Sequence, residues 1–441
     1  MRASGFIRCA TMASLRWVNP SSLSRLSVRR NVNGLWCMAS STSQSLPLFY
    51  NDVYEVELPP THRFPMEKYR MVREGLQRDL GWDRRDGAIS ESVDVSFHVS
   101  PLATLDDLLT THDLSYVERY TRGLFTEKEN RVVGFPWSLR GVNRTLSSVG
   151  GTVGAMHAVC RGTDVVRGRV RERCRGGVML AGHIAGGTHH AFRSRGEGFC
   201  VFSDIAVAAN VALRDYRGTI KQVLVVDCDV HQGNGNACLF AGNPAVFTFS
   251  MHCKSNYFSA VEKSDIDVEM EEGAGDKEYL ATLEQWLPEL MDRVRPDLIF
   301  YQAGVDPLIH DRLGRLKLTR EGLRERNRLV YAIALANKTP VVVTMGGGYP
   351  MDMDPRSEGF YHIVRSHMDV YCQCSAAASV IYVKLHSLLF SISFLSWCRP
   401  FVALLADEAI PTLQHKPSSA ASVTQFLHHV PSSQVAYPHI F

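Results

Sequence analysis

The sequence lacks the cysteine pattern of a small secreted or zinc-finger domain. Eleven cysteines occur in 441 residues, yet none form a CxxC pair and only Cys372 and Cys374 lie close together. Irregular spacing of this kind predicts neither a disulfide framework nor a cysteine-based zinc site. We therefore expect a protein of a reducing compartment.

The sequence also lacks a bulk excess of charge of either sign. Its 48 lysines and arginines stand against 45 aspartates and glutamates, which gives a formal net charge of +3. This balance argues against direct nucleic-acid binding through overall charge. The apolar fraction of 45% and the charged fraction of 21% are ordinary globular values, which exclude a wholly disordered or polytopic membrane protein.

Acidic residues are missing from the first 51 positions, since the first acid is Asp52. The same stretch holds six arginines and no lysine, and it is rich in serine. Residues 1–45 thus have the composition of an organelle transit peptide, and we expect import into a mitochondrion or chloroplast. A disordered tail is the alternative, which would leave the nucleus or cytoplasm as the location.

The C-terminal region contains an apolar stretch that is too interrupted to span a membrane. Val380–Trp397 is broken by Lys384, His386 and several serines. A spanning helix needs about 20 predominantly apolar residues, and a central lysine costs roughly 2.5–3.5 kcal/mol. We therefore predict no transmembrane segment, and we treat residues 376–441 as an atypical tail.

Between the leader and this tail, short apolar runs alternate with helix-like stretches. The clearest runs are Val223–Val226, Val246–Phe249, Leu298–Tyr301 and Val341–Thr344. Continuous apolarity predicts strands buried on both faces, as in a parallel sheet covered by helices. Helical patterns at Lys277–Arg295 and Thr319–Asn337 supply βαβ connections. We predict one large α/β domain over residues 46–375, with a mostly parallel central sheet flanked by helices.

One segment interrupts this alternation. Residues 164–177 contain five arginines between Arg167 and Arg175. Such a run can bind an anion, but it is more typical of a solvated loop. We therefore expect a solvated loop at these residues.

Residues with metal-binding side chains follow the buried strands, where open α/β sheets bind their ligands. Asp227, Asp229 and His231 alternate with Cys228 and Val230, so an extended chain would project the first three to one side. Two carboxylates and an imidazole crowded on one face repel and desolvate one another. A divalent metal would neutralise them.

A third candidate ligand follows another predicted strand. Asp306 precedes Pro307, which biases it toward an extended conformation at the strand end. Asp229, His231 and Asp306 would then form a set of two oxygens and one nitrogen. Three protein ligands leave one position open for water, which is the arrangement of a catalytic zinc ion, one per chain.

Two glycine-rich motifs present further reactive groups. Gly186-Gly187-Thr188-His189-His190 ends in adjacent histidines, and Gly346-Gly347-Gly348-Tyr349 ends in a phenol. The second motif lacks the Lys-Ser/Thr pair of a phosphate-binding P-loop. Taken alone, the histidine pair favours a structural role.

Along the chain these four motifs stand at residues 186–190, 227–231, 306–307 and 346–349. In that order they resemble the histone deacetylase superfamily, which includes acetoin-utilisation-type proteins and acetylpolyamine amidohydrolases. The segment His231-Gln232-Gly233-Asn234-Gly235 is most similar to the class IV enzymes and their bacterial relatives. The resemblance covers about residues 46–375, and relative to the family the Arg-rich residues 164–177 look like an insertion between a helix and the strand that leads to His189. Further matching stretches are His112–Val117, Gly198–Asp204 and Asp311–Gly314.

The resemblance implies an arginase-like α/β fold and hydrolysis of an acetyl amide, in a histone, another protein or a small acetylated amine. It implies that zinc is held by the three ligands named above. His190 would be the general base, His189 its electrostatic partner, and Tyr349 the hydrogen-bond donor to the oxyanion.

Neighbouring positions also match the family. Asp227 would orient His189, while Asn234 stands where class I members place an acid beside the second histidine. Asp227 and Ser250 match positions around a monovalent cation, potassium. The walls of a narrow acyl-lysine tunnel would be Gly198, Phe199 and Leu313.

Other interpretations remain open. A deacetylase of acetylpolyamines would keep the fold and change only the substrate. An arginase-like dimanganese hydrolase needs more carboxylates near His231, yet residue 233 is glycine. A non-haem iron oxygenase uses two histidines and one carboxylate, whereas Asp229 and Asp306 make this set rich in carboxylates. A non-enzymatic acyl-lysine-binding scaffold would need neither Tyr349 nor the histidine pair. The oligomeric state does not follow from the sequence.

Overall fold

The computed structural model describes residues 45–59, 61–81, 94–161, 165–166, 169–170 and 178–379. Three predicted segments lie largely outside these residues: the leader, of which only Ser45 is described, most of the Arg-rich segment, and nearly all of the tail. Within the Arg-rich segment, β3 (Val165–Val166) and β4 (Arg169–Val170) form a two-stranded antiparallel pair. The larger described elements belong to one compact unit.

An eight-stranded sheet forms the centre of this unit, and every pair of neighbouring strands is parallel. The strands in spatial order are β2 (Asp94–Val99), β1 (Ser45–Tyr50), β5 (Leu180–His183), β10 (Val341–Thr344), β9 (Leu298–Gln302), β6 (Val223–Asp227), β7 (Val246–Cys253) and β8 (Ile266–Met270). The predicted α/β class is confirmed, and the sheet is entirely rather than mostly parallel.

The two faces of the sheet belong to two separate hydrophobic clusters. Within β6, Val223 and Val225 join one cluster, while Leu224 and Val226 join the other. Successive side chains of a strand point to opposite faces, so both sets are buried only when helices cover both faces. This explains why the central strands appear in the sequence as unbroken apolar runs.

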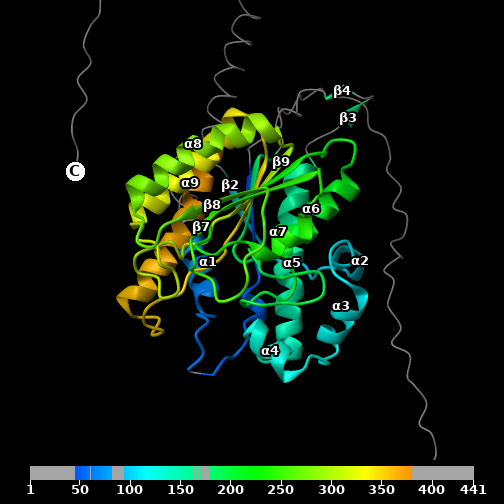
Figure 1. Ribbon diagram of the computed structural model, residues 1–441, viewed down its shortest axis with the longest axis vertical. Coiled ribbons are helices and arrows are strands. Elements are labelled where there is room, and N and C mark those ends of the chain that lie inside the picture. Colours follow the sequence, from blue (N-terminus) through cyan, green and yellow to red (C-terminus); the bar gives the residue numbers. More distant parts are fainter. Residues whose placement is uncertain are drawn as a thin grey trace, which may run out of the picture. The chain divides into compact units, whose positions relative to one another are not determined.

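Two groups of helices cover these faces (Figure 1). One group contains α5 (Leu139–Cys160) and α6 (Asp204–Asp215). The other contains α1 (Lys68–Gly81), α8 (Asp276–Val294), α9 (Arg320–Ala336) and the helical residues 358–379. The remaining helices are short: η1 (Asp52–Tyr54), α2 (Leu105–Leu108), α3 (Leu114–Thr121), α4 (Glu127–Val133) and α7 (Asn234–Phe240).

Helix ends follow local capping chemistry. Thr319 is the N-cap of α9, and its side chain accepts a hydrogen bond from the backbone N–H of Gly322 at 3.0 Å. Ser203 caps α6 in the same way. Such caps satisfy amide donors that have no partner within the helix. The helices predicted at Lys277–Arg295 and Thr319–Asn337 agree with α8 and α9 to within one residue at each end.

Four adjacent central strands, β5, β10, β9 and β6, end at the same edge of the sheet because they are parallel. The candidate metal ligands and the predicted catalytic side chains lie at these strand ends or shortly after them. Asp227 is the last residue of β6, and Asn234 is the first residue of α7. No helix within the described ranges is long and apolar enough to cross a membrane.

Candidate active site

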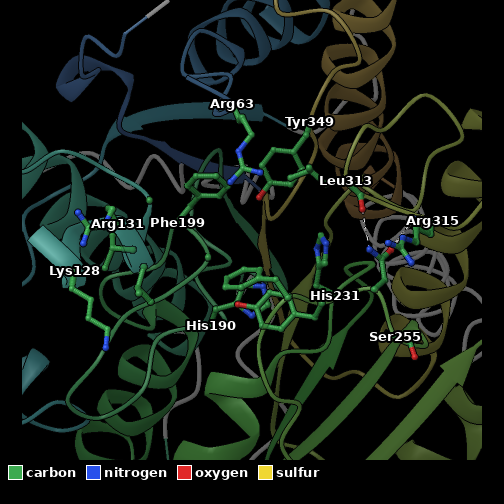
Figure 2. Close-up of a pocket in the computed structure, with 17 residues that line it drawn as sticks. Arg63, Lys128, Arg131, His190, Phe199, His231, Ser255, Leu313, Arg315 and Tyr349 are labelled. Carbon is green, nitrogen blue, oxygen red and sulfur yellow. Dashed lines mark hydrogen bonds between the residues drawn. The ribbon is translucent and has the colours of Figure 1, made fainter. Parts of the chain in front are cut away.

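A cavity of about 670 Å³ opens at this edge of the sheet (Figure 2). Its size lies in the range of small-molecule pockets. The predicted site residues that line it are His190, Gly198, Phe199, His231, Leu313 and Tyr349. The structure thus brings together groups that lie up to 159 residues apart in the chain, from His190 to Tyr349.

The three predicted metal ligands meet beside this cavity. One ligand atom from each of Asp229, His231 and Asp306 lies within 4.8 Å of the other two, and all three residues are buried. The chain reaches this arrangement differently from the sequence-based prediction. Strand β6 ends at Asp227, and the backbone bends at Asp229 and His231 instead of continuing as an extended strand. Asp227 therefore stays outside the ligand set.

The donor atoms fit a divalent metal ion. The Oδ2 atom of Asp306 is buried and has no hydrogen-bond donor among the described residues, although His231 Nδ1 lies 3.2 Å away in an unsuitable direction. Burial, and then the negative charge of Asp229, raise the pKa of Asp306 to about 6. Two buried carboxylates need a compensating positive charge, and two oxygens with one nitrogen suit zinc.

Neighbouring groups hold the ligand carboxylates in place. Asp229 Oδ2 accepts hydrogen bonds from Gln302 Nε2 at 3.0 Å and from the backbone N–H of Gly347 at 2.9 Å. Asp306 Oδ1 accepts one from the N–H of Val230 at 2.9 Å. Partners of this kind orient the ligands and exclude other rotamers.

A fully buried arginine ties together the two loops that carry these carboxylates. Arg326 of α9 donates hydrogen bonds to the carbonyl oxygens of Cys228 at 3.2 Å, Ala303 at 3.1 Å and Gly304 at 2.6 Å. Because these carbonyls precede Asp229 and Asp306, one guanidinium fixes the backbone of both loops.

The histidine pair is held by two different partners. His189 Nδ1 lies 2.7 Å from a carboxylate oxygen of Asp227, and His190 Nδ1 lies 2.8 Å from the amide oxygen of Asn234. Burial lowers the pKa of His189, but the charges of Asp227 and Asp229 outweigh it and raise that pKa to about 9. Burial and the neighbouring imidazoles hold the pKa of His190 well below its usual value.

A buried glutamate stands behind Asn234. The Asn234 amide nitrogen donates to Glu197 Oε1 at 2.8 Å, and Tyr257 donates its hydroxyl to the same oxygen at 3.2 Å. This contact fixes which end of the amide faces His190, so that His190 Nδ1–H donates and its Nε2 carries no proton. Tyr257 also stacks on the His190 ring, with centroids 4.2 Å apart.

The wall of the cavity depends on a strained turn. Gly198 has φ +57°, and a Cβ at this position would lie 2.7 Å from the hydroxyl oxygen of Tyr257 and 2.8 Å from the His190 ring. Phe199 also has a positive φ of 67°, which is uncommon for a residue with a side chain. The turn places Phe199 in the cavity lining, which also contains Leu313.

A single buried carboxylate positions two other lining residues. Asp311 accepts hydrogen bonds from the backbone N–H of Leu313 at 2.7 Å and of Tyr349 at 2.6 Å. Burial, and then the charges of Asp306 and Asp229, raise the pKa of the Tyr349 hydroxyl well above its usual value. The phenol therefore stays protonated and reaches into the cavity as a donor (Figure 2).

The residues predicted to bind a monovalent cation lie next to each other. Asp227 at the end of β6 is the register partner of Ser250 in β7. The hydroxyl of Ser250 lies 3.0 Å from His252 Nδ1.

Four residues of the site were not among those predicted from the sequence: Glu197, Tyr257, Gln302 and Arg326. Gln302 could have been identified from the sequence, because it is a polar residue at the end of the apolar run that forms β9. Arg326 could also have been identified, because its helical spacing from Leu323 and Val330 places all three on the same buried face of α9. The loop residues Glu197 and Tyr257 offer no comparable pattern.

Comparisons with known proteins agree with this geometry. Residues 62–361 match the family described as histone deacetylase domain. An uncharacterized protein of Picosynechococcus sp. is 39% identical over 326 residues, which cover 74% of this chain and 99% of that protein. Histone deacetylase 2 of Arabidopsis thaliana is 33% identical over 187 residues, 40% of this chain and 48% of that protein. The acetoin utilization protein AcuC of Staphylococcus aureus is 26% identical over 262 residues, 56% of this chain and 64% of that protein.

Solved structures show the same fold. A crystal structure of an HDAC homolog complexed with SAHA superposes with a TM-score of 0.57 at 22% identity, covering 76% of this chain and 84% of the other. An HDAC homolog from Aquifex aeolicus gives a TM-score of 0.56 at 21% identity. Because the domain match covers residues 62–361, the chain belongs to the histone deacetylase family of hydrolases, which act on acetylated substrates.

Proposed function

We propose that this protein is a zinc-dependent amidohydrolase that removes acetyl groups from lysine side chains of histones or other proteins. The observation that carries the proposal is the buried set of Asp229, His231 and Asp306 beside a cavity that also presents His190 and Tyr349. A deacetylase needs an activated water, a base and an oxyanion donor within one small volume, and this site supplies candidates for each.

A zinc ion held by the three ligands would polarise the acyl carbonyl and lower the pKa of water at the site toward about 7. His190 is the general base, because its Nδ1–H is committed to Asn234 and its Nε2 is free to accept a proton. The same nitrogen then returns the proton to the departing amine. His189, paired with Asp227, contributes positive charge beside the reacting group.

Tyr349 would stabilise the oxyanion that develops on the acyl oxygen. Its protonated hydroxyl donates to this oxygen most strongly when the negative charge appears, and therefore in the transition state. The apolar rings and side chains of Phe199 and Leu313 would enclose the aliphatic stem of the lysine. We also propose potassium at Asp227 and Ser250, where it would link the end of β6 to the middle of β7.

Turnover by the purified full chain on acetyl-lysine peptides and acetylpolyamines tests the proposal, with zinc measured on the same sample. We expect peptide hydrolysis by protein that holds about one zinc per chain. Hydrolysis of acetylpolyamines but not of peptides would show that the substrate is a small acetylated amine instead of a protein. Absence of hydrolysis on both panels, by folded and zinc-loaded protein, would overturn the proposed reaction.

We also propose that residues 1–45 direct import into a mitochondrion or chloroplast, because they are rich in arginine and serine and contain no acid. A fluorescent fusion of residues 1–50 should collect in one of these organelles. A fusion that stays diffuse in the nucleus and cytosol would contradict the targeting role.

A further inference from the structure

The rim of the cavity, formed by the solvent-exposed residues that line it, contains cations and no carboxylate. Four of its lining residues are cationic, and none of the seventeen is aspartate or glutamate: the cations are Arg63, Lys128, Arg131 and Arg315. They surround the opening from separate elements, with Lys128 and Arg131 on one side, Arg63 on another and Arg315 on a third (Figure 2). All four are exposed to solvent.

The backbone that carries these cations is well fixed. Helix α4 bears Lys128 and Arg131, and it begins with a capping box between Thr126 and Glu129. The backbone N–H of Arg315 donates to the Asn256 side chain at 2.8 Å. The carbonyl oxygen of Arg63 accepts a hydrogen bond from Arg312 at 3.0 Å, which adds a fifth cation close to the rim.

Acidic residues compensate this charge only in part. Arg131 pairs with Glu127 at 3.6 Å, and Arg315 pairs with Glu272 at 3.5 Å. Both pairs are exposed, and exposed pairs of this kind contribute only about 0–1 kcal/mol, so an incoming carboxylate can replace the partner. Within the described ranges, neither Arg63 nor Lys128 forms an ion pair.

The rim also offers apolar surface for groups that flank the acyl-lysine. Phe258 lines the cavity with 72% of its surface exposed, and Val132 lines it with 41% exposed. The cavity of about 670 Å³ is far larger than one lysine stem requires, so neighbouring residues of a polypeptide would contact this rim. A rim of one charge sign in a concave surface concentrates ligands of the opposite sign.

We propose that the enzyme selects acetyl-lysine within acidic segments of proteins. The inference rests on the proposed deacetylase function and specifies its substrate class. An acetylpolyamine keeps positively charged amines, and a basic histone-tail segment carries several lysines and arginines. Both would place cations against the four cations of the rim, whereas aspartates or glutamates beside the acetyl-lysine would pair with them.

Three peptides of equal length test this selection on zinc-loaded full-length protein. Each has one central acetyl-lysine, with flanks that are acidic, neutral or basic. We expect kcat/KM to fall from acidic to neutral to basic, by about tenfold or more between the extremes at low salt. The differences should shrink as salt is raised, because exposed charges are screened. N-acetylated polyamines should behave like the basic peptide.

Charge reversal at the two unpaired cations provides the matched test. Arg63→Glu combined with Lys128→Glu should favour the basic peptide over the acidic one. Lys128 lies in the first turn of α4, where an acidic residue suits the helix dipole and should not weaken the fold. The control is Arg217→Glu with Lys277→Glu, two exposed positions outside the cavity lining, which should keep the parental order.

The outcomes separate this inference from the proposed function. Equal rates on all three peptides, or a preference for basic flanks, would overturn the selection and leave the deacetylase assignment intact. Hydrolysis of none of the peptides by folded, zinc-loaded protein would overturn both.

Discussion

At the scale of single residues, the two adjacent histidines show how one partner sets the role of a side chain. His189 faces the carboxylate of Asp227, and His190 faces the neutral amide of Asn234. A carboxylate stabilises an imidazolium, whereas an amide oxygen only selects a tautomer. Two neighbours in sequence thus favour different protonation states, His189 the charged imidazolium and His190 the neutral imidazole, which suits the roles proposed for them.

Tyr349→Phe tests the oxyanion donor. The hydroxyl matters where charge develops on the acyl oxygen, so kcat should fall roughly 10²–10³-fold while zinc binding and KM change little. Steady-state kinetics on one acetyl-lysine peptide measures kcat and KM, and a parallel zinc determination measures metal binding. A variant within about threefold of the parental kcat would show that another group faces the oxyanion.

Glu197→Ala tests the residue that orients Asn234. Without Glu197 the amide can rotate, and the tautomer of His190 is no longer fixed, so we expect kcat to fall about 10–100-fold with zinc content unchanged. Glu197→Gln keeps an acceptor for the amide and should restore most of the activity. Ser259→Ala removes a contact at 3.3 Å to the other Glu197 oxygen and serves as the control. Parental kcat in Glu197→Ala would contradict this role.

At the scale of elements, the site depends on contacts between a helix and two loops. The donors of Arg326 join α9 to the loops after β6 and β9, although the helix itself contributes nothing to the cavity lining. The geometry of the ligand carboxylates is therefore coupled to how α9 packs on the sheet.

Arg326→Met removes this connection. Each carbonyl left without a donor in the interior costs about 1–3 kcal/mol, so the urea midpoint should fall clearly and zinc retention should weaken. Arg328→Met in the same helix breaks only an exposed pair with Glu325 and is the control. A fully stable Arg326→Met protein with stoichiometric zinc would contradict the connecting role.

The elements themselves could largely be predicted, and the reason is physical. Strands buried on both faces appear as apolar runs, and parallel strands bring the residues that follow them to one edge. The proximity of Asp229, His231 and Asp306 could be predicted in this way. The bend after Asp227 could not be predicted, because the alternation of polar and apolar residues was interpreted as an extended chain. The contact of Glu197 with Asn234 joins a loop residue to the first residue of α7, 37 residues further along the chain, and no periodic pattern in the sequence indicates it.

At the scale of the whole molecule, buried neutral histidines link stability to pH. Burial lowers the pKa of His112 to about 4 and that of His183 to about 4. His112 uses its neutral form, since its Nδ1 lies 3.0 Å from the Phe192 carbonyl and its Nε2 accepts from the N–H of Ser203 at 3.0 Å.

Stability should therefore fall in mild acid. An unfolded histidine titrates near about 6.5, so between pH 6.5 and 4 the unfolded chain binds protons that the folded protein does not. This contribution is complete above about pH 6.5 and is lost as the pH falls toward 4, by roughly 3 kcal/mol for each histidine. Urea midpoints at pH 7 and pH 5 measure it.

Single variants assign the effect to these groups. His112→Gln should reduce the difference between the two midpoints, while the exposed His98→Gln should leave it unchanged. Equal midpoints at pH 7 and pH 5 in the parent would contradict the pH dependence.

Metal removal and return tests the central claim most directly, namely that hydrolysis depends on one zinc ion held by Asp229, His231 and Asp306. The protein is stripped with a chelator, its fold is checked by circular dichroism, and zinc is titrated back while hydrolysis of an acetyl-lysine peptide is followed. We predict no activity without metal, a linear rise to about one equivalent, and neither zinc retention nor hydrolysis in a folded Asp306→Asn variant. Hydrolysis at the parental rate by metal-free protein, or stoichiometric zinc in folded Asp306→Asn, would contradict the account.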